Sequence, residues 1–159
     1  METLPKSQLV LFTDAYDSLA FPSLVMVPKV FDSMDGHIVF AAERNSNPDE
    51  GLSALFAELH DGGSADMGPF RHLNSGQFIG RAGDILVMLH EVQSYGSLCA
   101  TFNDQRGFTR YYLENPETVR LDDNAQIFLC LEDIPPEWIF IEPHSMQLHC
   151  RNHSSYWAW

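Results

Sequence analysis

A chain of 159 residues, 45% of them apolar and 12% aromatic, is long enough to bury a core and has the composition of a globular domain rather than of a disordered segment. Its formal net charge of −13 argues against nucleic acid or an anionic membrane as a partner, although a nucleotide whose phosphates are held by a divalent cation stays compatible. No apolar run reaches the length of a transmembrane helix, and three cysteines without a CxxC pair indicate neither a disulfide framework nor a zinc finger. We therefore expect a single domain over residues 1–159.

The first predicted element is a short apolar strand over residues 9–12 (LVLF). A run of this length bounded by polar residues is typical of a buried strand in a parallel sheet. Asp14 and Asp17, with Tyr16 between them, would then lie at the carboxyl end of the strand, where open α/β sheets place their ligand sites. Two carboxylates suit Mg²⁺ or Mn²⁺. The alternative is an Asp-rich turn in which Asp17 caps the next helix.

A helix and a second strand are predicted next. Apolar residues spaced over 24–31 allow a short helix, and residues 38–42 (IVFAA) are interpreted as a second buried strand that ends at Glu43. Two strands with a helix between them predict a right-handed βαβ unit. Asp49 could cap a further helix over residues 50–59, and the glycine-rich residues 61–69 are interpreted as a loop that could act as a lid.

The second half of the chain alternates extended and helical patterns. Residues 73–80 are predicted to be extended, and Gly76 within them indicates a bulge or a close backbone approach to a ligand. Asp84 could cap an amphipathic helix. A further helix is expected over residues 102–113, and strands are expected over residues 119–121, 126–131 and 138–141.

Polar side chains recur where these predicted elements begin or end. Asp14, Asp17, Glu43, the segment 74–76 and Asp104 each lie at a strand end, a turn or a helix start. One sheet edge could gather them, which is the geometry of a nucleotide-sugar site. We therefore predict an α/β fold, in which a Rossmann-like mixed sheet is flanked by helices.

The order of these segments resembles the glycosyltransferase domain of the procollagen-lysine hydroxylase/glycosyltransferase (lysyl hydroxylase, PLOD-like) family. The resemblance runs from about residue 9 to residue 131. It implies a GT-A fold, a Mn²⁺ (or Mg²⁺) ion, a UDP-galactose or UDP-glucose donor and a collagen-like hydroxyl acceptor such as hydroxylysine. The segments that carry it are 11–17 (LFTDAYD), 39–43 (VFAAE), 73–80 (LNSGQFIG), 103–105 (NDQ), 121–122 (LD) and 126–128 (QIF).

The resemblance also implies which residues bind the donor. Asp14 and Asp17 would bind the metal as the first and last acids of an Asp-x-x-Asp motif, and Tyr16 would lie against the uracil. A histidine late in the domain would complete the metal site. His149 is the first choice because it follows an apolar segment and precedes an Asn, and His144 is the second.

The transferred sugar and the acceptor would contact two further segments. Asn74, Ser75 and Gly76 would hydrogen-bond the sugar. Asp104, with Asn103 beside it, would orient or deprotonate the acceptor hydroxyl. The alternative for Asp104 is capping at a helix N-terminus, where an Asp is common for electrostatic reasons alone.

Three departures from the family pattern leave alternatives open. The family's acidic pair is Asn103–Asp104 here, its tryptophan before Pro-Asp is Asn47, and only eight residues precede the first strand, so the chain resembles the later part of a GT-A domain that lacks the nucleotide-binding strands. A non-catalytic remnant or binding module is therefore one alternative. An aspartate-based phosphohydrolase is less favoured, because its two Asp residues stand two positions apart rather than three.

The N-terminus lacks the charged and apolar regions of a signal peptide. The cytoplasm is therefore expected if the chain is complete, and the secretory pathway or endoplasmic reticulum if it is a fragment of a longer family member. The sequence leaves the sugar, the acceptor and the oligomeric state open.

Overall fold

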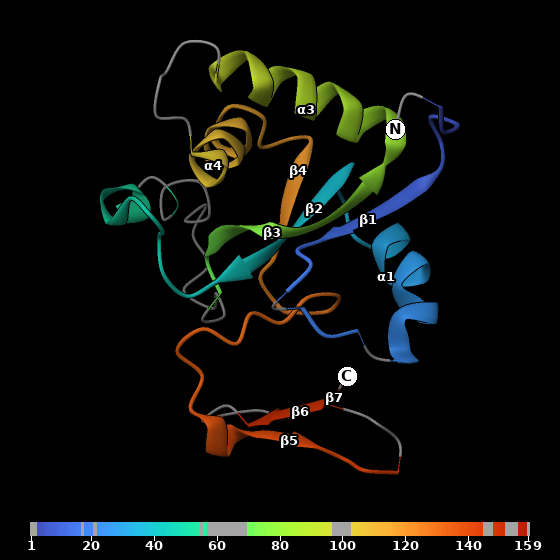
Figure 1. The fold of residues 1–159 in the computed structure, drawn as a ribbon, viewed down its shortest axis with the longest axis vertical. Helices are drawn as coiled ribbons and strands as arrows, with labels where there is room; N and C mark the ends of the chain where they lie inside the picture. Colours follow the sequence, from blue (N-terminus) through green and yellow to red (C-terminus); the bar gives the residue numbers. More distant parts are fainter. Residues whose placement is uncertain are drawn as a thin grey trace.

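The computed structural model of the chain describes residues 3–16, 18–20, 22–54, 56, 70–96, 103–144, 148–151 and 156–158. In these residues a four-stranded mixed sheet forms the centre of the molecule (Figure 1). Its spatial order is β1-β3-β2-β4, and its strands are β1 (Leu9–Thr13), β2 (Ile38–Glu43), β3 (His72–Arg81) and β4 (Val119–Asp122). β2 pairs with β3 antiparallel and with β4 parallel.

β2 is the most deeply buried strand of the central sheet because it carries no polar residue before Glu43, and all six of its residues are buried. Its alternating side chains divide between the two faces of the sheet. Ile38, Phe40 and Ala42 belong to the larger core cluster, whereas Val39 and Ala41 belong to a smaller cluster on the other face. An apolar strand of this kind is what a sheet covered on both faces requires.

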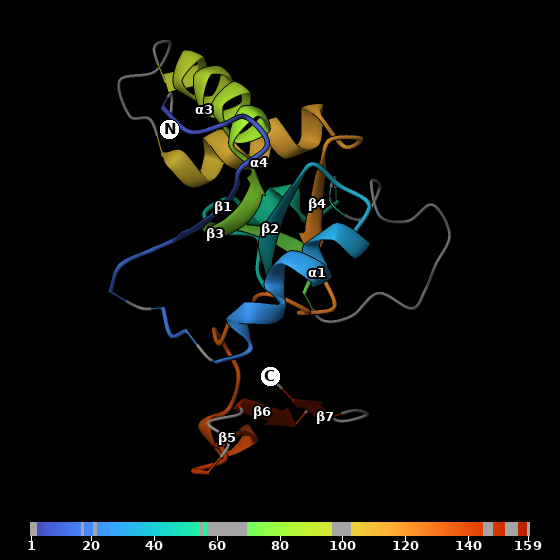
Figure 2. The same cartoon turned by 90° about the vertical axis from the view of Figure 1, so that its right-hand side faces the viewer.

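Helices supply the cover on both faces. The larger cluster includes side chains of α3 (Ala82–Gly96) and α4 (Asp104–Glu114), and the smaller one includes Phe31 of α1 (Val27–Ser33). Figure 2 shows α3 and α4 together on one side of the sheet and α1 on the other. Three 3₁₀ helices also lie among the described residues: η1 (Pro22–Met26), η2 (Glu50–Leu52) and η3 (Pro136–Trp138).

A bulge interrupts β3 at the glycine expected to mark one. Phe40 of β2 lies opposite Phe78, but the next residue, Ala41, lies opposite Asn74, so residues 75–77 have no partner on β2. On the other side of β3, Gln77 still pairs with Thr13 of β1. The bulge around Gly76 is therefore confirmed, and it displaces the backbone at the end of the sheet where β1, β2 and β4 end.

The prediction that residues 9–12 form a buried strand is wrong, and a third strand separates the two parallel strands of the predicted βαβ unit. β3 lies between the two strands and is antiparallel to both, so β1 and β2 run in the same direction without touching, and β1 is at the edge of the sheet. Leu11 and Phe12 are 38% and 43% exposed. A short apolar run does not reveal which strand lies beside it. At the sheet edge, the ring of Phe12 packs on the ring of Phe78, with 4.7 Å between ring centroids.

The strand predicted over residues 126–131 is also absent, although this segment lies entirely among the described residues. The backbone N–H groups of Gln126, Ile127 and Phe128 donate to the carboxylate of Asp122 at 2.6, 2.6 and 2.7 Å. These groups are therefore not available to a neighbouring strand, and the segment forms a loop.

Three helix starts and one strand differ in detail from the prediction. The side chain of Asp49 makes no capping hydrogen bond to η2. Its carboxylate instead pairs with Arg106 of α4. α3 begins at Ala82 rather than at Asp84, and α4 begins at Asp104. Residues 57–69, which include the end of the predicted helix and the predicted lid, lie outside the described residues, and of the strand predicted over 138–141 only Ile139–Ile141 is extended.

A second, smaller sheet follows the central one. β5 (Ile139–Ile141), β6 (Leu148–Arg151) and β7 (Tyr156–Ala158) pair antiparallel in that order and lie apart from α1, α3 and α4, at the bottom of Figure 1. In the part of the chain that the structure describes, no helix is both long enough and apolar enough to cross a lipid bilayer.

Candidate functional site

A cleft of about 1420 Å³ lies where β1, β2 and β4 end and β3 begins. Because three strands of the same direction end there, the residues that follow each of them meet at one edge of the sheet. Segments from both halves of the chain line the cleft, among them the end of β1, the bulge of β3, the loop after β4 and β5. The edge predicted to gather polar side chains is therefore a real concave surface.

Asp14 lies on this surface directly against the bulge. Its backbone N–H donates to the carbonyl oxygen of Gly76 at 2.8 Å. A Cβ atom on residue 76 would lie 2.8 Å from Oδ2 of Asp14 and 3.1 Å from Oδ1 of Asn74. The missing side chain of Gly76 thus makes room for the Asp14 carboxylate, which lines the cleft.

Asn74 connects the bulge to the end of β2. Its Oδ1 accepts from the N–H of Gly76 at 2.9 Å, and its Nδ2 donates to Oε2 of Glu43 at 2.9 Å. Both ends of the amide therefore hold protein groups. In this arrangement Asn74 orients the bulge and Glu43, and one of its amide hydrogens has no acceptor among the residues that the structure describes.

Gln105 of α4 holds the next residue of the bulge. Its Oε1 accepts from the N–H of Ser75 at 2.8 Å, and its Nε2 donates to the carbonyl of Leu73. Gln105 and Ser75 also line the cleft. The Gln105 side chain therefore connects the start of α4 to the bulge. In the sequence, Gln105 is part of the segment 103–105 but was assigned no role of its own.

Asn103 and Asp104 serve the start of α4 in this structure. Oδ1 of Asn103 accepts from the N–H of Arg106 at 3.1 Å, which makes Asn103 the N-cap. Oδ1 of Asp104 accepts from the N–H of Gln105 at 2.8 Å. Asn103 lines the cleft, whereas exposed Asp104 is not among its lining residues. The N-cap of α4 is thus Asn103 rather than Asp104, and the role of Asp104 toward an acceptor stays a prediction.

The structure does not place the side chains of the remaining predicted site residues in the cleft beside Asp14. Tyr16 is fully exposed, and it is not among the residues that line the cleft. Asp17 lies outside the described residues. The backbone of His149 lies in β6 opposite Phe140 and Ala158, but its side chain is not described, and His144 is exposed. Of the predicted metal ligands, only the carboxylate of Asp14 is therefore placed in the cleft.

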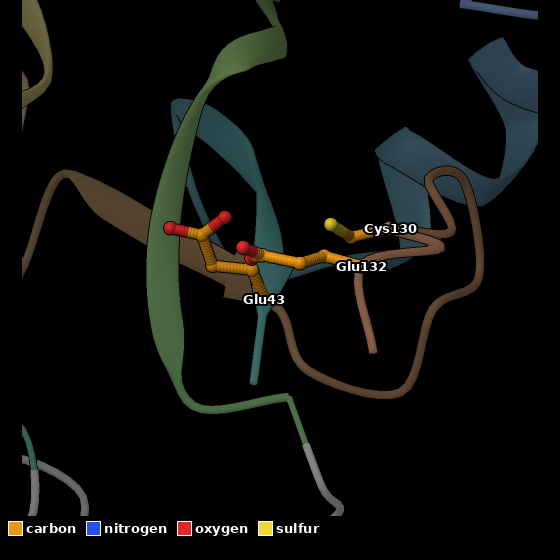
Figure 3. A group of neighbouring side chains, drawn as sticks. All are labelled: Glu43, Cys130 and Glu132. Atoms are coloured by element: carbon orange, nitrogen blue, oxygen red, sulfur yellow. The ribbon is translucent and has the colours of Figure 1, made fainter. Parts of the chain in front are cut away.

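A group of side chains that the sequence did not bring together lies on the same surface. Three residues, Glu43, Cys130 and Glu132, each contribute one ligand atom, and these atoms lie within 4.8 Å of one another (Figure 3). Burial, and then the nearby carboxylate of Glu132, raise the pKa of Glu43 to about 7 against the hydrogen bond from Asn74. The sequence marked Glu43 as a carboxylate at a strand end. Cys130 and Glu132 gave no signal, because they are 87 and 89 positions away from it.

The chain is similar to one family profile and to several known proteins. A family profile described as the PLOD GT domain matches residues 2–155. The chain is 30% identical over 113 residues to a procollagen-lysine,2-oxoglutarate 5-dioxygenase of Drosophila melanogaster, covering 71% of this chain and 14% of the relative. It is 30% identical over 129 residues to procollagen-lysine,2-oxoglutarate 5-dioxygenase 1 of Mus musculus, covering 78% and 16%.

A third relative carries the glycosyltransferase activity in its name. The multifunctional procollagen lysine hydroxylase and glycosyltransferase LH3 of Rattus norvegicus is 29% identical over 127 residues, covering 77% of this chain and 16% of the relative. The chain thus spans less than one fifth of the length of each of these three relatives.

Proposed function

We propose, since the chain belongs to the family of PLOD GT domains, that its cleft takes part in transferring galactose or glucose from a UDP-sugar to a hydroxyl group of a collagen-type acceptor. The family and its glycosyltransferase-like, GT-A-like α/β architecture rest on the profile match over residues 2–155. The observation that supports the finer proposal is the position of Asp14 in the cleft at the carboxyl edge of the sheet.

Among the described residues, the carboxylate of Asp14 suits a divalent cation at this position. The carboxylate of Asp14 is a hard oxygen donor, and the space left by Gly76 keeps it against the cleft wall. We propose Asp17 and His149 as the further ligands. When bound there, Mn²⁺ or Mg²⁺ supplies positive charge that stabilises the diphosphate leaving group.

The chain's own residues would position the donor and the acceptor. Gly76 lets the backbone of the bulge approach the sugar closely, and Ser75 lies beside it on the cleft surface. Tyr16, exposed two positions after Asp14, is free to lie against a uracil ring. Asp104 would act on the acceptor hydroxyl from the start of α4, as a group that orients it or accepts its proton.

A binding module without transferase activity is the second candidate. It is favoured by the hydrogen bonds of Asn103 and Asn74, which are directed at backbone and side-chain groups of the protein itself. A module of this kind would still hold UDP through the cation at Asp14. Measuring binding and transfer separately therefore distinguishes the two candidates.

The test is calorimetric titration of UDP into the 159-residue chain, with and without Mn²⁺. We expect binding that requires Mn²⁺ and that Asp14→Asn abolishes. Asp35→Asn removes an exposed carboxylate outside this cleft and is the matched control. Absence of UDP binding by a folded wild-type chain would overturn the proposal.

A transfer assay then separates the enzyme from the module. UDP-galactose and UDP-glucose are supplied with a hydroxylysine-containing collagen peptide, and the glycosylated peptide is measured by mass. Transfer that depends on Asp104 supports the enzyme, and UDP binding without transfer supports the module.

A further inference from the structure

The cluster of Glu43, Cys130 and Glu132 combines two kinds of ligand atom. Two carboxylate oxygens and one thiol sulfur lie within 4.8 Å of one another, and all three residues line the cleft. Glu43 comes from the end of β2, and the other two come from the loop that precedes η3. Two carboxylates this close repel each other unless a proton or a cation lies between them.

Hydrogen bonds from residues that follow β2 hold the loop in this position. Nδ2 of Asn47 donates to both carboxylate oxygens of Glu132 at 3.3 and 3.4 Å. Nη1 of Arg44 donates to the carbonyl of Asp133 at 3.0 Å, and Nδ2 of Asn45 donates to its Oδ2 at 2.6 Å. Three side chains within four residues after Glu43 thus help to place Cys130 and Glu132 beside it.

One oxygen of the buried Glu43 carboxylate lacks a hydrogen-bond partner among the described residues. Glu43 is only 4% exposed, and Oε2 accepts the hydrogen bond of Asn74. Its other oxygen, Oε1, accepts no hydrogen bond from any residue that the structure describes. Figure 3 shows one oxygen of Glu43 directed toward β3 and the other toward the side of Glu132 and Cys130. A buried oxygen without a partner is costly, and a cation in the cluster would satisfy it.

We propose that Glu43, Cys130 and Glu132 bind a zinc ion, with a fourth position open to the cleft. A thiolate favours Zn²⁺ over Mg²⁺ or Mn²⁺, which prefer oxygen ligands alone. Tetrahedral Zn²⁺ places neighbouring ligand atoms roughly 3.5 Å apart, and the exposed side chain of Glu132 can turn to reach that spacing. On binding, the Cys130 thiol and any protonated carboxylate release their protons to water as the metal bonds form.

Asn74 sets this site apart from the cation position at Asp14. It donates to Glu43 with Nδ2 while its Oδ1 holds Gly76, against which Asp14 lies. Asn74 therefore orients a zinc ligand from outside, as an amide commonly does in metal sites. The zinc proposal does not depend on the proposed transferase activity, because no residue is shared between the two ligand sets.

Cobalt(II) is the probe that reports sulfur ligation directly. Titrating Co²⁺ into the reduced 159-residue chain should produce the near-ultraviolet charge-transfer absorption of a thiolate–cobalt bond, and stoichiometric Zn²⁺ should remove it. Cys130→Ser should abolish the band, and Glu132→Gln should weaken Co²⁺ binding about tenfold or more. Glu132 is exposed, so its variant tests the site without disturbing the core.

Matched controls separate this site from other ligands. The chain has two further cysteines, and the Cys99→Ser/Cys150→Ser variant should keep the band. Asp14→Asn should also keep it, whether or not that variant binds UDP. Absence of the band in the wild-type chain, its persistence in Cys130→Ser, or its loss in Asp14→Asn would each overturn the proposal.

Discussion

Two buried acids at the ends of neighbouring strands have opposite surroundings. Glu43 ends β2 and Asp122 ends β4, and these strands are parallel, with Asp122 opposite Ala41. Both side chains are buried, at 4% and 0% exposed. The carboxylate of Asp122 accepts three backbone hydrogen bonds from the loop that follows it, whereas that of Glu43 accepts one, from a side chain.

This difference separates a structural acid from an available one. Burial raises the pKa of both carboxyls; at Asp122 the three N–H donors oppose that shift, and at Glu43 the carboxylate of Glu132 adds to it. The backbone donors use both oxygens of Asp122, so its side chain organises the loop and has little capacity left for a ligand. Glu43 keeps one oxygen for whatever enters the cleft. Burial alone does not distinguish the two roles, but the hydrogen-bond partners do.

Removing the structural acid should have the largest effect. Asp122→Ala leaves three N–H groups of the loop without an acceptor, so we expect the free energy of unfolding to fall by about 3 kcal/mol or more. Urea denaturation followed by circular dichroism measures this. Asp123→Ala, at the next and less buried position, should change stability by only about 0.5 kcal/mol. Equal losses in the two variants would contradict a special role for Asp122.

Filling the space beside Asp14 should have the next largest effect. Gly76→Ala places a Cβ 2.8 Å from Oδ2 of Asp14, so we expect a loss of about 1–3 kcal/mol in stability together with weaker Mn²⁺-dependent UDP binding. Gly51→Ala is the matched control, because a Cβ there meets no atom within 4 Å. A Gly76→Ala chain as stable as Gly51→Ala and with unchanged UDP binding would show that this contact is dispensable.

Neutralising the available acid should cost little or nothing. In protein treated with a chelator, Glu43→Gln removes a buried carboxylate that faces Glu132 and keeps an acceptor for Asn74, so we expect stability at pH 8 to stay equal or to rise by about 1 kcal/mol. The same denaturation experiment measures it. A loss comparable to that of Asp122→Ala would erase the distinction between the two acids.

The smallest effect on stability is expected at an exposed acid, Asp49. Asp49 accepts two hydrogen bonds from the guanidinium of Arg106 at 2.7 and 2.8 Å, which lower the pKa of its carboxyl. Its contribution to stability is therefore present above the ordinary pKa near 3.8 and is lost as the pH falls through the lower folded value. Asp49→Asn should lower the melting temperature slightly at pH 7 and not at pH 2, and added salt should reduce the difference.

Much of the fold and part of the site were predictable because local pattern determines them. The apolar run of β2 and the periodicity of α3 and α4 identify these elements, and Gly76 marks the bulge of β3. Carboxylates that follow apolar strands predict a polar sheet edge, and the cleft lies there. The motif order also identifies the family, which the profile match over residues 2–155 confirms.

The sequence by itself therefore determined the strands and main helices of the central sheet, where the acids stand along them and which family the chain belongs to. Only the tertiary structure decided that β3 separates β1 from β2, that Asp122 takes the N–H groups of residues 126–128, and that Cys130 and Glu132 meet Glu43. The physical reason is distance along the chain. Periodicity and capping act over a few residues, whereas strand order and side-chain clusters depend on which distant segments exclude water together.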